Sequence, residues 1–273
     1  MFQCGRFQLD LSVPRIMGIL NVTPDSFSDG GLHATTQAAI SKAWQMIEDG
    51  ADVIDIGGES TRPGAQSVNL DDELARVLPV IAALRDAPVP LSVDTMKPQV
   101  MQAALDAGAV LINDVNALRT PGALDVVAAS DAGVCLMHMQ GAPRTMQASP
   151  HYHNVVAEVG IFLAERVAVV KAAGIPDRRI MLDPGFGFGK SQQHNLALLR
   201  DMGQLAKMGY PLLLGISRKS ILGAITGRPV DERMPASIAA ALYGVMHGAS
   251  MVRVHDVAET RDALQIYKAI RGE

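Results

Sequence analysis

Residues 37–57 read QAAISKAWQMIEDGADVIDIG, and this stretch contains the unit from which the fold is built. Residues 37–49 have the apolar spacing of a helix, and Gly50 follows where a left-handed residue commonly ends one. Residues 53–56 form a short run of branched apolar side chains around Asp55, as in a β-strand. The stretch therefore predicts a helix that leads through a glycine turn into a strand.

The same alternation recurs along the chain, because eight short apolar runs are each followed by a turn and a helical segment. The predicted strands are residues 16–20, 53–56, 91–93, 110–112, 134–137, 180–182, 212–216 and 251–254. The predicted helices are residues 37–49, 71–85, 99–106, 123–129, 155–173, 196–208, 236–247 and 257–270. A (β/α)8 barrel has eight such pairs in about 250 residues. We therefore predict an α/β protein in which residues 1–273 form one (β/α)8 TIM barrel domain, with a short hairpin turning at residues 4–6 and closing its N-terminal face.

The composition argues against several functional classes. The 273 residues are 48% hydrophobic and carry a formal net charge of -4 without a basic block, so nucleic acid is not an expected partner. The most apolar window, 236–252, is too polar to span a membrane, and Arg6 and Asp10 interrupt any signal peptide. Two distant cysteines, Cys4 and Cys135, form no disulfide framework, so we expect reduced thiols in a cytoplasmic protein.

A polar side chain lies at or just after the end of every predicted strand. In a (β/α)8 barrel the strand ends and the loops that follow them build the active site, and three of these loops, 22–36, 57–69 and 139–154, are unusually long. Each polar residue alone is compatible with an ordinary cap or turn. Together they predict a site that needs a ligand rich in N–H groups, because buried carboxylates require donors. The residues are Asn21, Asp55, Asp94, Asn113, His138, Asp183, the turn 217–220, and Arg253 with His255.

Cations in the same loops predict an anionic group on the ligand. Arg62 lies in the second long loop, and Lys219 follows the seventh strand. Barrels often bind phosphate after strands seven and eight at a helix N-terminus, where this chain has Arg253 and His255. We therefore predict that these two residues contact phosphate. The alternative for Arg253 is a salt bridge to a neighbouring carboxylate.

Three short motifs do not support other chemistries. Residues 184–191 end like a P-loop, but Pro184 stands where the first glycine is required, and Lys190 occupies the last position of a G-x-G-x-x-G pattern. The pair His151 and His153 lacks an obvious third zinc ligand. Residues 217–219 lack the G-x-S-x-G elbow of a hydrolase nucleophile.

Long motifs in the chain resemble the dihydropteroate synthase family. Residues 18–31, GILNVTPDSFSDGG, are similar to the first family signature, and residues 50–64, GADVIDIGGESTRPG, are similar to the second. Shorter similar blocks are residues 92–95, 113–114, 137–141, 182–190, 217–220 and 253–256. The resemblance spans nearly the whole chain. It implies a TIM barrel that joins 6-hydroxymethyl-7,8-dihydropterin diphosphate to para-aminobenzoate, forming 7,8-dihydropteroate and diphosphate.

The resemblance also implies roles for individual residues. The pterin would contact Asp94, Asn113, Met137, Asp183, Phe188 and Lys219, with Asp55 beneath its pocket. The diphosphate would contact Asn21, Arg62, Arg253 and His255, with Mg²⁺ bound by Asn21 and diphosphate oxygens. Para-aminobenzoate would lie among Phe27, Thr61, Pro63, Phe188, Lys219 and Ser220. The catalytic residues would be Arg62, Lys219, Arg253 and His255.

Two other functions compete with this one. Methyltransferase modules with a pterin-binding barrel pass a methyl group from a folate or pterin to a corrinoid, and they need no diphosphate pocket. A non-catalytic pterin-binding protein would lack diphosphate-site residues. The signatures around Asn21 and Arg62 favour the synthase. Family resemblance further implies a homodimer, to which the alanine-rich segment 235–245 could contribute.

Overall fold

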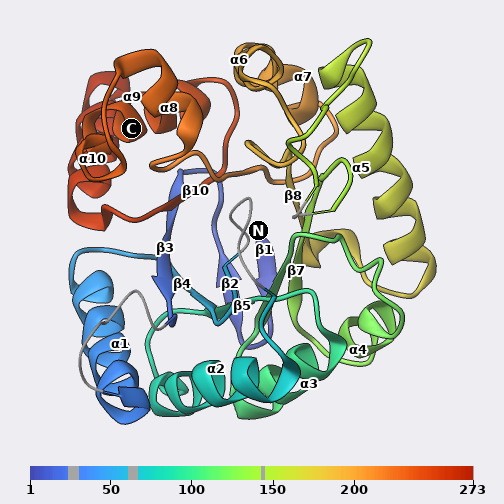
Figure 1. The fold of residues 1–273 in the computed structure, drawn as a ribbon, viewed down its shortest axis with the longest axis vertical. Helices are drawn as coiled ribbons and strands as arrows, with labels where there is room; N and C mark the ends of the chain where they lie inside the picture. Colours follow the sequence, from blue (N-terminus) through green and yellow to red (C-terminus); the bar gives the residue numbers. More distant parts are fainter. Residues whose placement is uncertain (24–30, 61–66, 143–144, 273) are drawn as a thin grey trace.

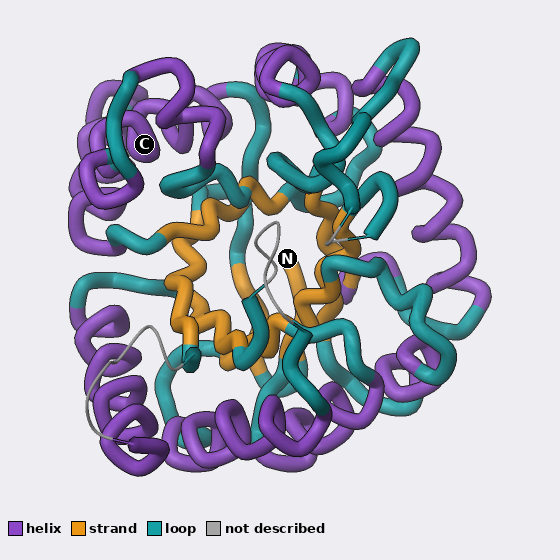
Figure 2. The backbone as a smooth tube through the Cα atoms, viewed as in Figure 1, coloured by secondary structure: helices purple, strands orange, loops and turns teal. Residues whose placement is uncertain are grey.

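The computed structural model describes residues 1–23, 31–60, 67–142 and 145–272, and its centre is a barrel of parallel strands. The eight strands lie in the order β8-β7-β6-β5-β4-β3-β10-β9, and a parallel bridge between Leu182 and Leu212 joins the two ends. Figure 2 shows the resulting ring of strands inside a ring of helices. The strands are β3 (Arg15–Asn21), β4 (Val53–Gly57), β5 (Leu91–Asp94), β6 (Leu111–Asp114), β7 (Gly133–Met137), β8 (Ile180–Asp183), β9 (Leu213–Leu214) and β10 (Met251–Val254). The predicted barrel is confirmed.

Helices cover the outer face of the barrel (Figure 1). They are α1 (Gly31–Glu48), α2 (Leu70–Leu84), α3 (Pro98–Ala107), α4 (Ala123–Ala128), α5 (Val155–Ala172), α6 (Gln192–Arg200), α7 (Met202–Ala206), α8 (Ser220–Thr226), α9 (Met234–Met246) and α10 (Val257–Arg271). Short 3₁₀ helices lie at Asp177–Arg179 and Val230–Glu232. The prediction of one helix over 196–208 is wrong, because the helix breaks at Asp201, whose ψ of 16° is not helical. Within the described residues, no helix is long and apolar enough to cross a membrane.

Glycine turns end the helices where the sequence indicates. Gly50 has φ 98° and Gly108 has φ 122°, a left-handed conformation that other residues rarely adopt. The N–H of Gly108 donates to the carbonyl oxygens of Ala104 and Leu105, both at 3.1 Å. After Gly50, the N–H of Asp52 donates to the carbonyl of Ile16 at 2.8 Å. Each turn therefore delivers the chain directly to the next barrel strand.

A hairpin closes the N-terminal end of the barrel. Strand β1 (Phe2–Cys4) pairs antiparallel with β2 (Phe7–Leu9) through a turn at Gly5, whose φ is 52°. Both strands lie within the outline of the barrel when it is viewed end on (Figure 1). Phe2 and Cys4 form one packed cluster with inward-facing side chains of the barrel, namely Met17, Val53, Leu111, Cys135, Met181, Leu213 and Met251. The predicted hairpin is therefore confirmed, and it seals this end with an apolar layer.

Alternation along each strand then places polar groups at the opposite end. On β4, Val53 belongs to the apolar layer, and Asp55 is the next residue that faces the same side. The residues between them, such as Ile54, face outward and pack under the helices. The inner surface thus changes from apolar to charged along the barrel axis. The strand ends carry the charged half, as in other barrels of this kind.

Candidate active site

Four polar residues meet on three neighbouring strands. The register pairs Asp55 of β4 with Ser92 of β5, and Asp94 of β5 with Asn113 of β6. Asp55 and Ser92 have no exposed surface, and Asp94 and Asn113 are 9% and 4% exposed. The Nδ2 of Asn113 donates to Oδ2 of Asp55 at 3.0 Å. The structure therefore brings the predicted residues Asp55, Asp94 and Asn113 together in one buried cluster, to which Ser92 adds a hydroxyl that the sequence analysis did not predict.

Arg253 reaches this cluster from β10. Its Nε donates to Asp55 Oδ2 at 2.6 Å, and its second terminal nitrogen donates to Asp94 Oδ2 at 2.7 Å. Burial alone would lower the pKa of Arg253, but the two carboxylates raise it, so the guanidinium stays charged. The salt bridge that the sequence left open as an alternative is present. The contact of Arg253 with diphosphate stays a prediction.

Three buried oxygens in the cluster have no hydrogen-bond partner among the described residues. They are Asp55 Oδ1, Asp94 Oδ1 and Ser92 Oγ. A buried polar atom without a partner costs about 1–3 kcal/mol, so these atoms indicate where ligand donors bind. Burial raises the pKa of Asp94 to about 7, and the nearby Asp55 carboxylate adds to this, although Arg253 opposes both. Donors from a ligand would therefore stabilise the ionised form of Asp94.

Asp183 and Lys219 form a second group, from β8 and from the turn after β9. The N–H of Gly185 donates to Oδ1 of Asp183 at 2.7 Å. Burial raises the pKa of Asp183, while this N–H and the charge of Lys219 oppose the shift. Lys219 donates to the carbonyl of Phe186, and its Nζ lies 4.2 Å from the centre of the Phe188 ring. Burial lowers the pKa of Lys219 to about 8, so it is mainly charged at neutral pH.

Methionines form an apolar wall at the same end of the barrel. Met137 and Phe188, both predicted to contact the pterin, belong to one packed cluster. Sequence reasoning missed the other members, which are Met96, Val115, Met139 and Met146. The position of Met139, two residues after Met137, was the available signal. Unbranched methionine side chains pack well against flat, irregular ligands.

His255 has a partner that the sequence did not reveal. The Oγ of Ser217 lies 2.9 Å from His255 Nδ1, and the N–H of His255 donates to the same Oγ at 3.2 Å. Ser217 is 7% exposed and lies three residues after β9. The pair fixes the orientation of the imidazole ring. Ser220, in contrast, is exposed and begins helix α8.

Asn21 ends β3 and is paired with Gly57 of β4. A Cβ built on Gly57 would lie 3.8 Å from Asn21 Oδ1 and 3.9 Å from Asp94 Oδ2, so the glycine leaves room between these two oxygens. No group of three or more His, Cys, Asp or Glu residues that could hold a metal occurs among the residues described. Mg²⁺ commonly takes one or two protein oxygens and completes its shell with water and substrate phosphates. The Asn21 amide oxygen fits that kind of site.

Ion pairs and a hydrogen bond hold the described residues at the two ends of the second long loop. Lys97 Nζ pairs with the carboxylates of Glu59 and Glu73, and Glu59 Oε1 accepts from the N–H of Val68 at 3.2 Å. Sequence reasoning missed this network. It joins Glu59, which lies inside the second signature, to Lys97 and Glu73, which come after that signature. The predicted residues Phe27, Thr61, Arg62 and Pro63 lie outside the described residues, so their roles stay predictions.

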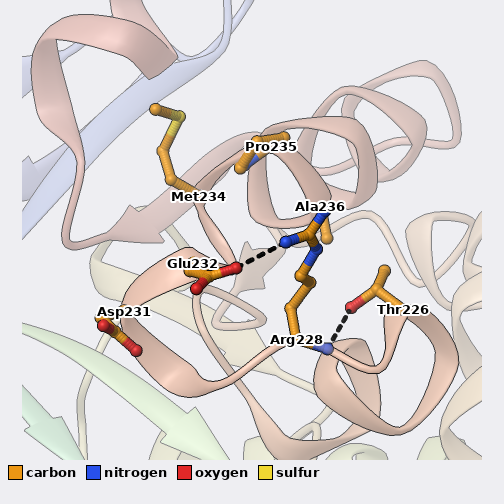
Figure 3. Close-up of a pocket in the computed structure, with 7 residues that line it drawn as sticks. All are labelled: Thr226, Arg228, Asp231, Glu232, Met234, Pro235 and Ala236. Carbon is orange, nitrogen blue, oxygen red and sulfur yellow. Dashed lines mark hydrogen bonds and ion pairs between the residues drawn. The ribbon is translucent and has the colours of Figure 1, made fainter.

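A separate hollow of about 500 Å³ lies at the outer helices. Its lining belongs to the segment that joins α8 to α9 and includes the exposed ion pair of Arg228 with Glu232, at 2.7 Å (Figure 3). None of its lining residues comes from a barrel strand, and none of the strand-end residues described above contributes to it. The strand ends, not this hollow, therefore form the candidate active site.

Comparisons with known proteins agree with this placement. The family model for pterin binding enzymes matches residues 17–255. The chain is 51% identical to dihydropteroate synthase from Neisseria meningitidis over 99% of its own length and 97% of that protein. It also resembles the Xanthomonas albilineans enzyme with 4-aminobenzoic acid, at 52% identity and a TM-score of 0.92, covering 97% of this chain and 96% of that one.

A second structure of the Xanthomonas albilineans enzyme, in complex with 7,8-dihydropteroate, is 49% identical to this chain. Its TM-score is 0.89, and the match covers 97% of this chain and 96% of that one. The family match over residues 17–255 extends over both signatures and over all the described strand-end residues. By fold, strand-end chemistry and sequence, the chain belongs to the dihydropteroate synthase family of pterin-binding enzymes.

Proposed function

We propose a role for each strand-end residue in the dihydropteroate synthase reaction, which this chain carries out in folate biosynthesis. The reaction joins 6-hydroxymethyl-7,8-dihydropterin diphosphate to para-aminobenzoate and releases diphosphate. The observation that carries the assignment is the set of buried carboxylate oxygens on Asp55 and Asp94 that have no partner among the described residues, since such oxygens need donors from a ligand. The aminopyrimidinone edge of a pterin supplies several N–H donors.

The pterin binds between the carboxylates of Asp94 and Asp183. Asp94 and Asp183 accept its N–H donors, while Asn113 and Lys219 reach its acceptor atoms. Met137 and Phe188 contact the ring faces, and their membership of one apolar cluster supports this. Asp55 lies beneath the pterin and holds Asn113 and Arg253 in place. Hydrogen bonds to ionised groups give this pocket most of its specificity.

Diphosphate binds next to the pterin. Arg253 exchanges its contact with Asp94 for diphosphate oxygens when the pterin donors satisfy that carboxylate. His255, oriented by Ser217, donates from Nε2 to the leaving group, since Nδ1 faces the serine hydroxyl. Asn21 would hold Mg²⁺, and the bound ion would supply positive charge against the diphosphate. Arg62 completes this site from the second long loop.

Bond cleavage precedes bond formation. The C–O bond to diphosphate breaks first, because the electron-rich dihydropterin stabilises positive charge on its exocyclic methylene. The amine nitrogen of para-aminobenzoate then forms the C–N bond and loses its proton to the released diphosphate or to water. Arg62, Lys219, Arg253 and His255 stabilise charge and position the groups, so no strong base is needed. The aminobenzoate lies among Phe188, Lys219 and Ser220, together with Phe27, Thr61 and Pro63.

The assembly proposed for the chain is a homodimer. Segment 235–245 lies in helix α9, where Tyr243 is 38% exposed and the adjacent Met246 is 63% exposed. Exposed apolar residues on one helix favour an interface. Light scattering tests the assembly, and a monomer at micromolar concentration contradicts it. We further propose a cytoplasmic enzyme with small-molecule substrates and no nucleic-acid or membrane partner.

The decisive experiment measures diphosphate release from purified protein given the pterin diphosphate and Mg²⁺, with and without para-aminobenzoate. Chromatography follows 7,8-dihydropteroate in the same samples. Release coupled to product formation supports the proposal. Corrinoid-dependent methyl transfer without coupling supports the methyltransferase alternative, and pterin binding without either reaction supports a non-catalytic binding protein.

A further inference from the structure

Lys190 is a buried lysine that the proposed reaction does not use. Its side chain is 2% exposed, and its Nζ has four acceptors in reach. These are the carbonyl oxygens of Gly185 at 2.8 Å, Phe188 at 3.1 Å and His138 at 3.4 Å, and the imidazole Nδ1 of His138 at 2.9 Å. No carboxylate oxygen pairs with Lys190 among the described residues. This arrangement differs from the phosphate contact that a P-loop lysine makes.

The four acceptors belong to two separate loops. Gly185 and Phe188 are in the loop after β8, whereas His138 directly follows β7. The two backbones nearly touch, because a Cβ added to Gly185 would lie 1.9 Å from the His138 carbonyl oxygen. The carbonyl oxygens of Gly185 and His138 both lie within reach of the Lys190 Nζ, and carbonyl oxygens that converge in this way repel one another unless a donor lies between them. The ammonium group of Lys190 is that donor, so it joins the two loops.

The loop held by Lys190 also positions the pterin pocket. Its Gly185 N–H donates to Asp183, its Phe186 carbonyl accepts from Lys219, and its Phe188 ring faces the Lys219 ammonium. Other backbone groups of this loop have partners elsewhere: the N–H of Gly187 donates to Asn195, and the carbonyl of Gly189 accepts from Tyr152. A displaced loop would therefore move three of the proposed pterin contacts together.

We propose that Lys190 is a positioning residue of the pterin site: it fixes loop 184–190 against the end of β7 and supplies a buried positive charge near Asp183. The inference rests on the proposed pterin contact of Asp183. Lys190 itself touches no substrate. Its effect reaches the ligand through the geometry of the loop and through the ionisation of the Asp183 carboxylate.

The charge of Lys190 favours the ionised form of the Asp183 carboxylate. Burial raises the pKa of Asp183, whereas the Gly185 N–H and then the charges of Lys219, Lys190 and Arg253 oppose that rise. Burial raises the pKa of the Cys135 thiol and the Asp183 charge adds to this, so the thiol also lies near that carboxylate. Burial lowers the pKa of Lys190 to about 7 and that of His138 to about 3, so His138 is a neutral acceptor. Without the Lys190 charge, the pKa of Asp183 rises further, and its ionised form is lost at higher pH.

Two variants separate hydrogen bonding from charge. Lys190→Met keeps the length of the side chain but removes both donor and charge, whereas Lys190→Gln removes the charge and keeps a donor. Lys268→Met, on the exposed face of α10, is the matched control. Calorimetry measures the Kd of 6-hydroxymethylpterin for each protein between about pH 5 and pH 8, and circular dichroism checks the fold.

We expect Lys190→Met to raise the Kd by about tenfold or more at neutral pH. Lys190→Gln binds closer to the wild type at high pH, but its affinity falls at a higher pH than that of the wild type. The control keeps the wild-type Kd and pH dependence.

Two results overturn the inference. In one, folded Lys190→Met binds pterin with wild-type affinity and pH dependence. In the other, it loses only thermal stability, which makes Lys190 a purely structural residue. If Lys190→Met does not fold, the pH dependence of Lys190→Gln decides in the same way. Failure of the wild type to bind pterin would instead contradict the proposed function.

Discussion

The two ends of one barrel differ in almost every physical respect, although the same strands build both. At the N-terminal end, Phe2 and Cys4 pack on a wholly apolar layer, and burial raises the pKa of the Cys4 thiol to about 12. At the C-terminal end, Asp55, Asp94 and Arg253 share a buried network in which two carboxylate oxygens have no partner in the part of the chain that the structure describes. The apolar side chains of the first end pack against one another, whereas the carboxylate oxygens of the second end need hydrogen-bond donors from a ligand. Stability and chemistry are thus separated along the barrel axis, and this separation can be tested from both ends.

Phe2→Ala tests the apolar end and should have the largest effect. Phe2 is 1% exposed, so its truncation leaves a cavity and lowers the free energy of unfolding by about 3 kcal/mol or more. The turnover of the folded protein stays at the wild-type level, because the hairpin lies at the opposite end from the site. Urea unfolding and the coupled assay measure the two quantities. Phe7→Ala in the same hairpin is the control, and its half-buried ring predicts a smaller loss. A large drop in turnover for Phe2→Ala would show that the two ends are coupled.

Arg253→Ala tests the charged end. It removes the cation that pairs with Asp55 and Asp94 and that we place on the departing diphosphate. We expect kcat/KM to fall by about two powers of ten or more, since one charged contact in a transition state contributes a few kcal/mol. Steady-state kinetics checks this, with Arg200→Ala on α6 as the control. Near-normal turnover in the variant would remove Arg253 from the mechanism.

Asp94→Asn separates the stability of the empty protein from ligand binding. The folded pKa of Asp94 is raised to about 7 from its ordinary value of 3.8. Its contribution to stability is therefore fully present below about pH 4 and is lost as the pH rises through 7. Relative to the wild type, the ligand-free variant should gain about 1 kcal/mol or more near neutral pH, and little at pH 4.

The same substitution weakens pterin binding, because the charge-assisted hydrogen bond is lost. Urea unfolding at several pH values, together with calorimetry of pterin binding, tests both effects. Asp125→Asn on the exposed face of α4 should change neither. A variant that is less stable than the wild type at neutral pH would mean that the pairing of Asp94 with Arg253 outweighs its burial.

Much of the barrel follows from local rules, and so it could be predicted. Strand periodicity and glycine turns such as Gly50 and Gly108 depend on neighbours in sequence. The strand predicted over 212–216 is only Leu213–Leu214, with Leu212 forming a single bridge to Leu182. The barrel closes there through few contacts, and apolar character alone does not reveal pairing. Likewise, Gly203 lies two residues after the break at Asp201, but a single glycine is tolerated inside a helix and does not by itself mark a break.

The identity of the site residues was partly predictable, but their partners were not. Strand ends identified Asp55, Asp94 and Arg253, whereas the choice of Arg253 between a carboxylate and a phosphate depends on strands far apart in sequence. The partners of Lys190 were likewise not predictable from the sequence. Pro184 in place of the first glycine excluded a P-loop, but the role of Lys190 depends on a backbone contact between two loops. Such contacts come from the order of strands in the sheet, which no local pattern encodes.

Ser217→Ala gives the smallest expected effect and the finest test of the charged end. It removes the hydroxyl that lies 2.9 Å from His255 Nδ1, while the imidazole itself stays. Without that contact the ring adopts more orientations, so kcat should fall by about threefold to tenfold while the KM for pterin diphosphate changes little. Ser130→Ala, which removes a hydroxyl bonded to the Val127 carbonyl at 2.9 Å, is the control. Equal losses in Ser217→Ala and His255→Ala would mean that the histidine acts only when the serine holds it. No loss in Ser217→Ala would mean that diphosphate alone orients the ring.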